Sequence, residues 1–285
     1  MAKRQFGVST HLYHDQRLCR DHLLEVAAFG FETLEVYATR THFDYHNPSA
    51  VADLQQWLAE AGIELKRIHA PTAESFTGGR WGGSLSLASV DPEARARAVG
   101  ETERALHIAR RIPVPVLVMH LGIPRVQPRD ADVGPSDTRA AARRSIEELQ
   151  RIARPLGVRI VVEVIPNELS RAGSLVHFVE AELEGLDIGI CLDFGHAHID
   201  GDVVDAVEIV SEHFVATHLH DNNGRSDDHL LPFEGTIDWP AAITAVQKVG
   251  FDGPFIFEVV PQGSTKDTLA RARHVREKIE RLLAT

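Results

Sequence analysis

The sequence predicts an α/β fold, a single (βα)8 TIM barrel over residues 1–285. Eight short apolar runs alternate with eight longer segments whose apolar residues recur at helical spacing. A chain of 285 residues suits one large barrel better than two small domains. Most of the apolar runs also carry a histidine or a carboxylate at or near their carboxyl end, where barrel enzymes build their sites.

The strands are expected to be parallel and buried on both faces. The apolar runs are short, rich in β-branched residues and lack strict alternation of apolar and polar residues, as buried parallel strands do. We expect strands near residues 5–9, 33–37, 64–69, 114–120, 158–163, 187–193, 214–220 and 254–258.

The segments between the strands have the signals of helix starts and ends. Asp91 before Pro92, and Asp53 near Pro48, are interpreted as helix starts. Glycines stand where a C-cap is expected after a helix, at Gly30, Gly62, Gly157 and Gly250. We expect helices near residues 18–29, 49–61, 92–110, 138–155, 173–183, 202–210, 239–248 and 265–282.

The composition weighs against some partners and favours a reducing compartment. A net charge of -11 argues against general binding of nucleic acid, which selects for basic surfaces. Cys19 and Cys191 are far apart and make no disulfide framework. The start of the chain has no apolar signal segment, and no run is long enough to span a membrane. We therefore expect a cytoplasmic protein.

The candidate metal ligands share one position, at or just behind the end of a predicted strand. Burying an unpaired acidic or imidazole group costs several kcal/mol, so such endings rarely arise by accident. The residues are His69, His120, Glu163, Asp193, His196, His218, Asp227, His229 and Glu258. These five imidazoles and four carboxylates suit Zn²⁺ or Mn²⁺ and are too rich in nitrogen for Ca²⁺ or Mg²⁺.

The number of ions stays open between one and three per chain. In one interpretation all nine residues bind metal, and in the other only four do while the rest contact substrate. Two long loops follow His69 and His220, both at the carboxyl ends of strands. The glycine-rich stretch around Arg80 and Trp81 in the first loop is interpreted as a mobile lid that closes over the ligand.

The segments VMHLG, VVEV, CLDFGHAH, HLHDNNGRSDDHLLPFEGTIDW and FIFEV resemble the xylose isomerase-like TIM-barrel superfamily over nearly the whole chain. That superfamily holds sugar and sugar phosphate isomerases and epimerases, and the endonuclease IV class of DNA repair nucleases. In the isomerase branch the resemblance implies a single metal held by Glu163, Asp193, His218 and Glu258. In the nuclease branch it implies three zinc ions held by all nine residues.

Departures from the nuclease pattern favour the isomerase branch. Endonuclease IV usually has an asparagine where this chain has His220, and the loop after His69 does not resemble the DNA-penetrating loop of that nuclease. The phrase LPFEGTIDW and the acidic charge balance favour the same branch.

The resemblance implies a sugar or polyol-ketone isomerase or epimerase that transfers a proton through a metal-stabilised enediolate. Glu163 and Glu258 are the expected catalytic pair, one removing the proton and the other returning it. Substrate contacts are expected from His196, Arg225, Glu35, His69 and Trp81. For Glu35 a structural ion pair is an equal alternative.

Two other functions stay open. One is a zinc-dependent phosphodiesterase acting on abasic DNA, although the arginines of 95–111 and 139–144 have the spacing of ordinary helix surfaces. The other is a sugar-binding barrel without catalysis, in which the paired glutamates would have no task. Relatives often form homo-oligomers, and the sequence does not identify an interface.

Overall fold

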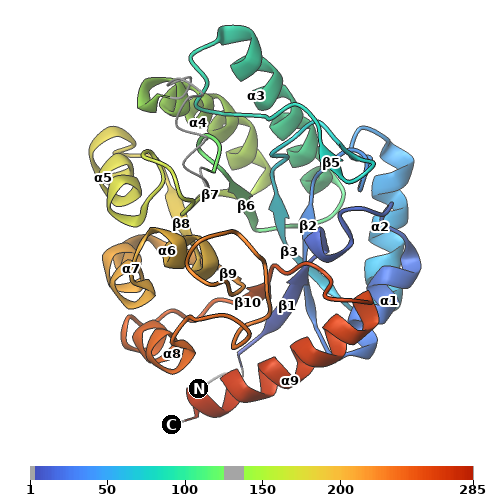
Figure 1. Cartoon of the computed structure of the whole chain (residues 1–285). Coiled ribbons are helices and arrows are strands. Elements are labelled where there is room, and N and C mark those ends of the chain that lie inside the picture. Colours follow the sequence, from blue (N-terminus) through green and yellow to red (C-terminus); the bar gives the residue numbers. More distant parts are fainter. Residues whose placement is uncertain (1–3, 125–137, 285) are drawn as a thin grey trace.

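Eight strands form the closed barrel that the sequence predicts (Figure 1). The structure, a computed structural model, describes residues 4–124 and 138–284. The barrel strands are β1 (Phe6–Ser9), β2 (Thr33–Tyr37), β3 (Glu64–His69), β6 (Val116–Met119), β7 (Arg159–Glu163), β8 (Ile188–Asp193), β9 (Phe214–Leu219) and β10 (Phe255–Phe257). They follow chain order around the ring, and β10 pairs with β1 to close it.

All barrel neighbours pair in parallel, so every strand has its carboxyl end at the same mouth. The register aligns the expected ligands with each other. Asp193 at the end of β8 pairs with His218 in β9, and Glu163 at the end of β7 pairs with Cys191. Polar residues far apart in the chain therefore reach the same level of the barrel.

Helices surround the barrel in a ring (Figure 1). They are α1 (Arg20–Ala28), α2 (Pro48–Ala61), α3 (Pro92–Leu106), α4 (Arg139–Ala153), α5 (Ala172–Glu182), α7 (Val203–Val210), α8 (Trp239–Lys248) and α9 (Thr265–Leu283). The expected ranges 92–110 and 138–155 each end in a tighter turn of 3-10 helix, η2 (His107–Arg110) and η4 (Arg154–Leu156).

One predicted helix start was wrong. Asp91 caps α3 as expected, because its carboxylate accepts from the backbone N–H of Glu93 at 2.8 Å. In α2, however, Asn47 is the capping residue and Asp53 lies inside the helix. The side chain directly before Pro48 decides the cap, since only a residue there reaches the free N–H groups of the first turn. The four predicted C-cap glycines all have positive φ, at Gly30, Gly62, Gly157 and Gly250.

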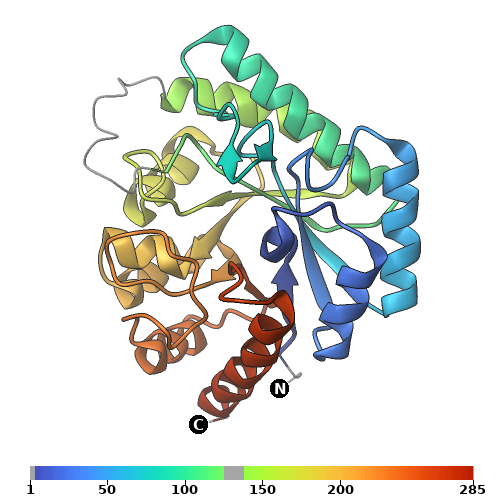
Figure 2. The same ribbon diagram turned by 45° about the vertical axis from the view of Figure 1, so that its right-hand side comes forward.

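Several short elements at the mouth were not predicted. The loop after β3 contains an antiparallel hairpin, β4 (Phe76–Thr77) and β5 (Arg80–Trp81), which Figure 2 shows at the mouth end of the barrel. A 3-10 helix, η1 (Thr10–Tyr13), follows β1, and a short helix, α6 (Phe194–Asp200), follows β8. The predicted mobility of the hairpin stays a prediction.

The barrel interior holds small apolar side chains and one arginine. Val118, Val161, Cys191 and Ala216 pack together inside it. Arg67 is buried on β3, where its guanidinium donates to the carbonyl oxygens of Thr217 at 2.7 Å and Pro254 at 2.9 Å. A buried positive charge thus lies beneath the acidic groups at the mouth.

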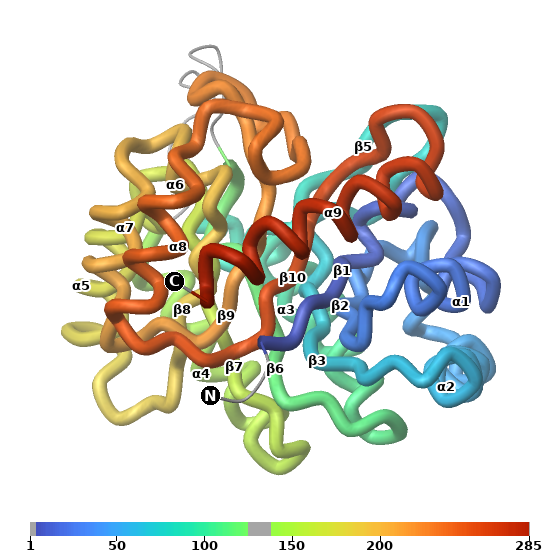
Figure 3. Tube along the Cα trace, turned by 90° about the horizontal axis from the view of Figure 1, so that it is seen from below, coloured from blue at the N-terminus to red at the C-terminus, as the bar shows by residue number. Residues whose placement is uncertain are grey.

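The first and last strands lie side by side, with α9 next to them (Figure 3). A larger apolar core fills the space between the barrel and its helices. Among the described helices none combines the length and the apolar character needed to cross a membrane.

Candidate metal centre

The nine predicted ligands form one contiguous cluster at the mouth of the barrel. Each lies within ion-pair distance of another member. The cluster is largely closed to solvent, and Asp193, His69 and His218 are fully buried. The side chains come from the ends of six strands, from α6 and from the loop after β9.

Glu163 lies at the centre of the cluster and touches histidines on two sides. Its Oε2 lies 3.1 Å from His69 Nε2 and 3.2 Å from His120 Nε2. Its Oε1 lies 3.1 Å from His218 Nδ1 and 3.5 Å from His196 Nδ1. A carboxylate placed in this way can bridge two cation sites, one on each oxygen.

His218 is held between carboxylates on both edges of its ring. Its Nε2 lies 2.8 Å from Glu35 Oε2, below the cluster. Its Nδ1 lies 2.8 Å from Glu258 Oε2 and 3.8 Å from Asp193 Oδ2. Glu35 thus orients the ring, as the carboxylates behind metal-binding histidines do. This position favours the ion-pair alternative for Glu35 over contact with substrate.

The hydrogen-bond geometry requires a proton or a cation between several of these groups. His69 Nδ1 lies 2.8 Å from the carbonyl oxygen of Ala70 and must carry a proton, while Nε2 faces Glu163 Oε2 at 3.1 Å. A neutral ring would direct a lone pair at a carboxylate oxygen, which is repulsive. His229 is in the same position, with Nδ1 on a carbonyl oxygen and Nε2 on a carboxylate.

The shifts in the pKa values of these groups also indicate that the cluster is stabilised by positive charge. Burial lowers the pKa of His69, but Glu163 outweighs it and the pKa rises to about 9. Burial likewise lowers the pKa of His229, and Asp227 raises it to about 9. Burial raises the pKa of Glu163, but His218 and His120 outweigh it and hold the pKa well below its usual range. A divalent cation would supply in one place the charge that these protons supply separately.

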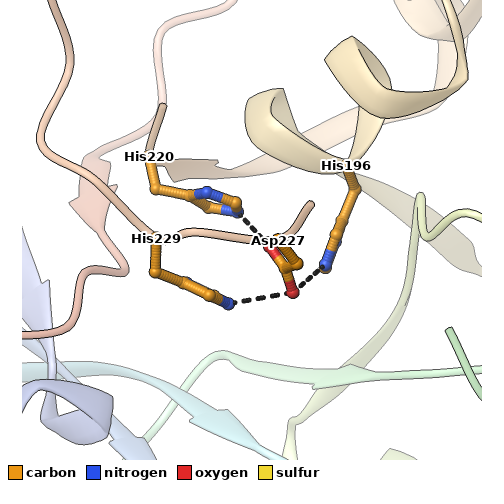
Figure 4. A group of neighbouring side chains, drawn as sticks. All are labelled: His196, His220, Asp227 and His229. Atoms are coloured by element: carbon orange, nitrogen blue, oxygen red, sulfur yellow. Dashed lines mark hydrogen bonds and ion pairs between the residues drawn. The ribbon is translucent and has the colours of Figure 1, made fainter. Parts of the chain in front are cut away.

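A second group of ligands surrounds Asp227 (Figure 4). His196 Nε2 and His229 Nε2 each lie 3.2 Å from Asp227 Oδ2. His220 Nε2 lies 3.8 Å from Asp227 Oδ1 and 2.8 Å from Asp193 Oδ1. One ligand atom from each of His196, His220, Asp227 and His229 lies within 4.8 Å of the others. Because His196 also reaches Glu163, the two groups are continuous.

His220 was not among the predicted ligands. Histidines at i and i+2 of an extended strand point to the same side, so the spacing of His218 and His220 in HLHD was the available signal. The ring stacks on His229 with centroids 4.1 Å apart. Space for it depends on Gly195, where an added Cβ would lie 1.9 Å from His220 Cε1.

The loop that carries Asp227 and His229 is anchored by Asp221. Its buried carboxylate accepts from the Trp239 indole at 2.8 Å and from the backbone N–H groups of Phe233 at 3.0 Å and Ile237 at 3.2 Å. These contacts explain why HLHD and FEGTIDW occur together in the sequence: the aspartate of one segment fastens the other.

Backbone strain marks the same loop. His229 has φ +45°, in the left-handed region that residues other than glycine rarely adopt. Strained conformations of this kind persist where the surrounding contacts impose them, and they concentrate at functional sites. The strain lets the His229 ring reach Asp227 while its Nδ1 contacts the Glu258 carbonyl oxygen.

A cavity of about 440 Å³ opens above the cluster. It is lined by Glu258, Asp227 and three of the predicted histidines, together with His11, His14, Tyr37 and Trp81. A larger hollow of about 640 Å³ lies elsewhere, along α3, and contains none of the predicted ligands. The smaller cavity is the candidate substrate site, because it alone of the two adjoins the cluster.

The predicted substrate-binding residues divide into two sets. His196 and Trp81 line the cavity. His69 and Glu35 are buried beneath it, and Arg225 is exposed on the loop after β9 and does not line it. His11 and His14 also line it.

Unpaired buried atoms indicate that the cluster fits a divalent ion. Asp227 Oδ1, His120 Nδ1 and His196 Nδ1 are buried without a hydrogen-bond partner among the described residues. Buried polar atoms are normally paired, so such a concentration at one place points to a missing partner. Imidazole nitrogens mixed with carboxylate oxygens are the donor set of Zn²⁺ and Mn²⁺.

Sequence comparisons identify related chains of similar length. A family model described as xylose isomerase-like TIM barrel matches residues 23–284. The uncharacterized protein MJ1311 of Methanocaldococcus jannaschii is 26% identical over 262 residues, which cover 89% of this chain and 83% of that protein. The uncharacterized protein y4fM of Sinorhizobium fredii is 33% identical over 102 residues, 34% of this chain and 33% of that one.

Solved structures share the fold. A D-tagatose 3-epimerase-like protein has a TM-score of 0.78 at 23% identity and covers 98% of both chains. D-psicose 3-epimerase of Clostridium cellulolyticum, solved with D-tagatose, has a TM-score of 0.74 at 19% identity over 98% of this chain and 99% of that one. The IolI protein, solved with a zinc atom, has a TM-score of 0.74 at 16% identity over 96% of both.

Proposed function

Because the chain belongs to the xylose isomerase-like TIM barrel family, we propose that it is a divalent-metal-dependent isomerase or epimerase of a sugar or a polyol ketone. One observation carries the proposal: the Glu258 carboxylate lines the cavity, and its Oε2 lies 2.8 Å from His218 Nδ1 within a cluster that fits a metal. The metal would be Zn or Mn, one to three ions per chain. Structural neighbours described as sugar epimerases support the class of reaction.

Glu258 is the residue best placed to move a proton. A divalent ion in the cluster would polarise a substrate carbonyl and acidify the adjacent C–H. Glu258 is 5% exposed and faces the cavity, so its carboxylate can take that proton and return it. Glu163 is the second catalytic candidate, but each of its oxygens already faces two imidazoles, which suits a ligand better than a base.

The cavity suits a neutral substrate. Among the described residues that line it there is no lysine or arginine, while Asp227 and Glu258 bring negative charge. Trp81 and Tyr37 offer flat apolar faces on which the C–H face of a sugar can rest. A phosphorylated sugar would find neither a lysine nor an arginine among these lining residues. We therefore propose an unphosphorylated ketose or polyol ketone as the small-molecule substrate.

The test combines metal analysis with proton exchange. Elemental mass spectrometry of the purified protein gives the ions per chain, and incubation in D₂O with a panel of neutral ketoses and inososes detects wash-in of deuterium. The proposal expects bound Zn or Mn and deuterium at the carbon next to the carbonyl. Absence of both metal and exchange contradicts it.

Paired variants separate the two glutamates. With metal added in excess so that the site stays occupied, Glu258→Gln should lower the exchange rate by about 100-fold or more, because a general base is lost. Glu163→Gln should lower the metal content itself, because one carboxylate serves two groups of histidines. If Glu258→Gln kept full exchange activity, the proposed role of Glu258 would be wrong.

One observation favours a second candidate function, zinc-dependent cleavage of abasic DNA. All nine residues that the nuclease branch would use are gathered in one cluster, with Glu163 between two histidine groups. About three Zn per chain together with incision of an abasic duplex would favour this function. One ion per chain and no incision would dismiss it.

A further inference from the structure

His11 is a cavity residue without an assigned task. It belongs to η1, directly after β1, and is 6% exposed. Its ring lines the cavity, and its Nδ1 is buried with no hydrogen-bond partner among the described residues. A buried imidazole nitrogen without a partner loses the hydrogen bond it would make in water. The geometry therefore calls for a ligand atom at this place.

The unpaired ring lies next to the proposed proton-transfer residue. One ligand atom from each of His11, His229 and Glu258 lies within 4.8 Å of the other two. The His229 nitrogens already contact Asp227 and a carbonyl oxygen. A molecule whose reacting carbon lies at Glu258 would therefore bring its neighbouring atoms within reach of His11.

Stacked rings hold His11 in this orientation. His14 lies 4.8 Å away, centroid to centroid, with an interplanar angle of 17°. Trp81 of the hairpin lies 6.4 Å away at 3°, and Tyr37 packs edge-on at 4.8 Å. Because three rings restrict the imidazole, the unpaired nitrogen keeps one direction, as a preorganised binding group should.

We propose that His11 is a substrate-binding residue that hydrogen-bonds a hydroxyl group of a neutral ketose or polyol ketone near the carbon that Glu258 deprotonates. The inference rests on the proposed function and adds a specificity contact to it. A hydroxyl can donate or accept, so it pairs with either tautomer of the ring. A phosphate oxygen would suit the place less well, because Asp227 and Glu258 lie beside it.

Two substitutions distinguish the contribution of the polar ring nitrogen of His11 from that of the flat ring itself. His11→Phe keeps a flat ring in the stack and removes the polar atoms. His11→Asn removes the ring but keeps a polar group near the position of Nδ1. His22→Phe is the matched control, since His22 also stacks on an aromatic ring, Tyr13 at 4.2 Å, but lies on α1 outside the cavity.

The affinity for D-fructose, D-tagatose and an inosose is measured by calorimetric titration of the metal-loaded protein, and KM and kcat come from deuterium exchange. His11→Phe should weaken binding and raise KM by about tenfold, the worth of one hydrogen bond, with a much smaller change in kcat. His11→Asn should recover part of that loss, and His22→Phe should leave both values unchanged. Wild-type affinity in His11→Phe would overturn the inference.

Metal content distinguishes a substrate contact from a further metal ligand. The number of ions per chain should be the same in His11→Phe and in the wild type. Loss of an ion in that variant would overturn the inference in favour of a metal site made with His229 and Glu258.

The two proposals can fail separately. If the wild type binds a ketose that His11→Phe binds weakly, but exchanges no deuterium, the proposed reaction fails and the His11 contact stands. If the wild type exchanges deuterium and His11→Phe has the same KM, only the His11 contact fails. If the wild type binds none of the three probes, the neutral substrate class and the His11 contact are both overturned.

Discussion

The contacts of single histidines in the cluster require positive charge, which either a proton or a metal ion must supply. His69, His218 and His229 each have one ring nitrogen on an oxygen acceptor and the other on a carboxylate. Without a bound cation, both ring nitrogens must carry a proton to make these contacts, so the rings must be imidazolium ions. A metal bound in the cluster would therefore compete with the histidine protons for the same places.

Metal-free protein should lose stability as the pH rises. Glu163 raises the pKa of His69 in the folded state from 6.5 to about 9, against the opposing effect of burial. Protonated His69 thus favours folding, fully so below pH 6.5, and this contribution is lost as pH rises through about 9. A shift of this size corresponds to about 3 kcal/mol. Urea titrations of chelator-treated protein across this pH range measure it.

His69→Asn serves as the control for the pH series, because it removes the titrating ring while it keeps a polar side chain. Its stability should vary less with pH over the same range. Equal pH dependence in the variant and the wild type would show that His69 is not a source of the effect.

At the scale of elements, short segments at the mouth position the cluster. Asp193 ends β8 and also caps α6, since its carboxylate accepts from the His196 backbone N–H at 2.7 Å. The same carboxylate lies 2.8 Å from His220. The turn from β8 to α6 therefore fixes the positions of His196 and His220. Gly195 inside that turn leaves room for the His220 ring.

Gly195→Ala should displace His220. The added Cβ would lie 1.9 Å from the ring, so the imidazole or the backbone of α6 must move. We expect a loss of about 1–3 kcal/mol in the free energy of unfolding and a lower metal affinity. Thermal unfolding with and without added zinc measures both effects.

Gly100→Ala is the matched control, since Gly100 lies in α3 and an added Cβ there meets nothing within 4 Å. That variant should be as stable as the wild type or more so. Adding His220→Ala to Gly195→Ala should restore part of the lost stability, because the collision partner is gone. A double variant no better than Gly195→Ala would mean that the collision is not the cause.

For the whole molecule, closure of the barrel brings the cluster together. Glu35 and His218 are 183 positions apart in the chain and touch only because the ring of strands is complete. The candidate ligands come from the ends of six of the eight barrel strands, from α6 and from the loop after β9. A metal that binds there would therefore stabilise the fold as a whole.

Metal removal should destabilise the protein, and more so at pH 9 than at pH 6.5. At the lower pH the histidine protons replace part of the lost positive charge, and near pH 9 they are leaving. Zinc at about 100 times its dissociation constant should add about 2.7 kcal/mol to the free energy of unfolding. Calorimetry of zinc binding in buffers of different ionisation enthalpy should also show proton release.

Manganese and magnesium titrations provide the comparison. Manganese should stabilise the protein and magnesium should not, because the ligand set is rich in imidazole. Equal stabilisation by magnesium, or none by zinc, would contradict a metal centre in this cluster.

Much of the fold could be predicted because its signals are local. Runs such as DIGICLD and FVATHLH carry the apolar pattern and the polar end of a buried parallel strand within a few residues. Hairpin β4–β5 and helix α6 were missed because they are short and are held by contacts with other segments, such as Trp81 on His14 at 5.4 Å. The end of the helix after Pro92 was misplaced by the change to a 3-10 turn.

The nine candidate ligands and their place at the barrel mouth were determined by the sequence alone, because a strand end is a local property and parallel strands share one mouth. Only the tertiary structure decided how these residues are grouped. It placed Glu163 between two sets of histidines, put Glu35 behind His218, and added His220. These relations depend on distances between segments that are remote in the chain. Barrel closure and side-chain packing establish those distances, and no local pattern in the sequence predicts them.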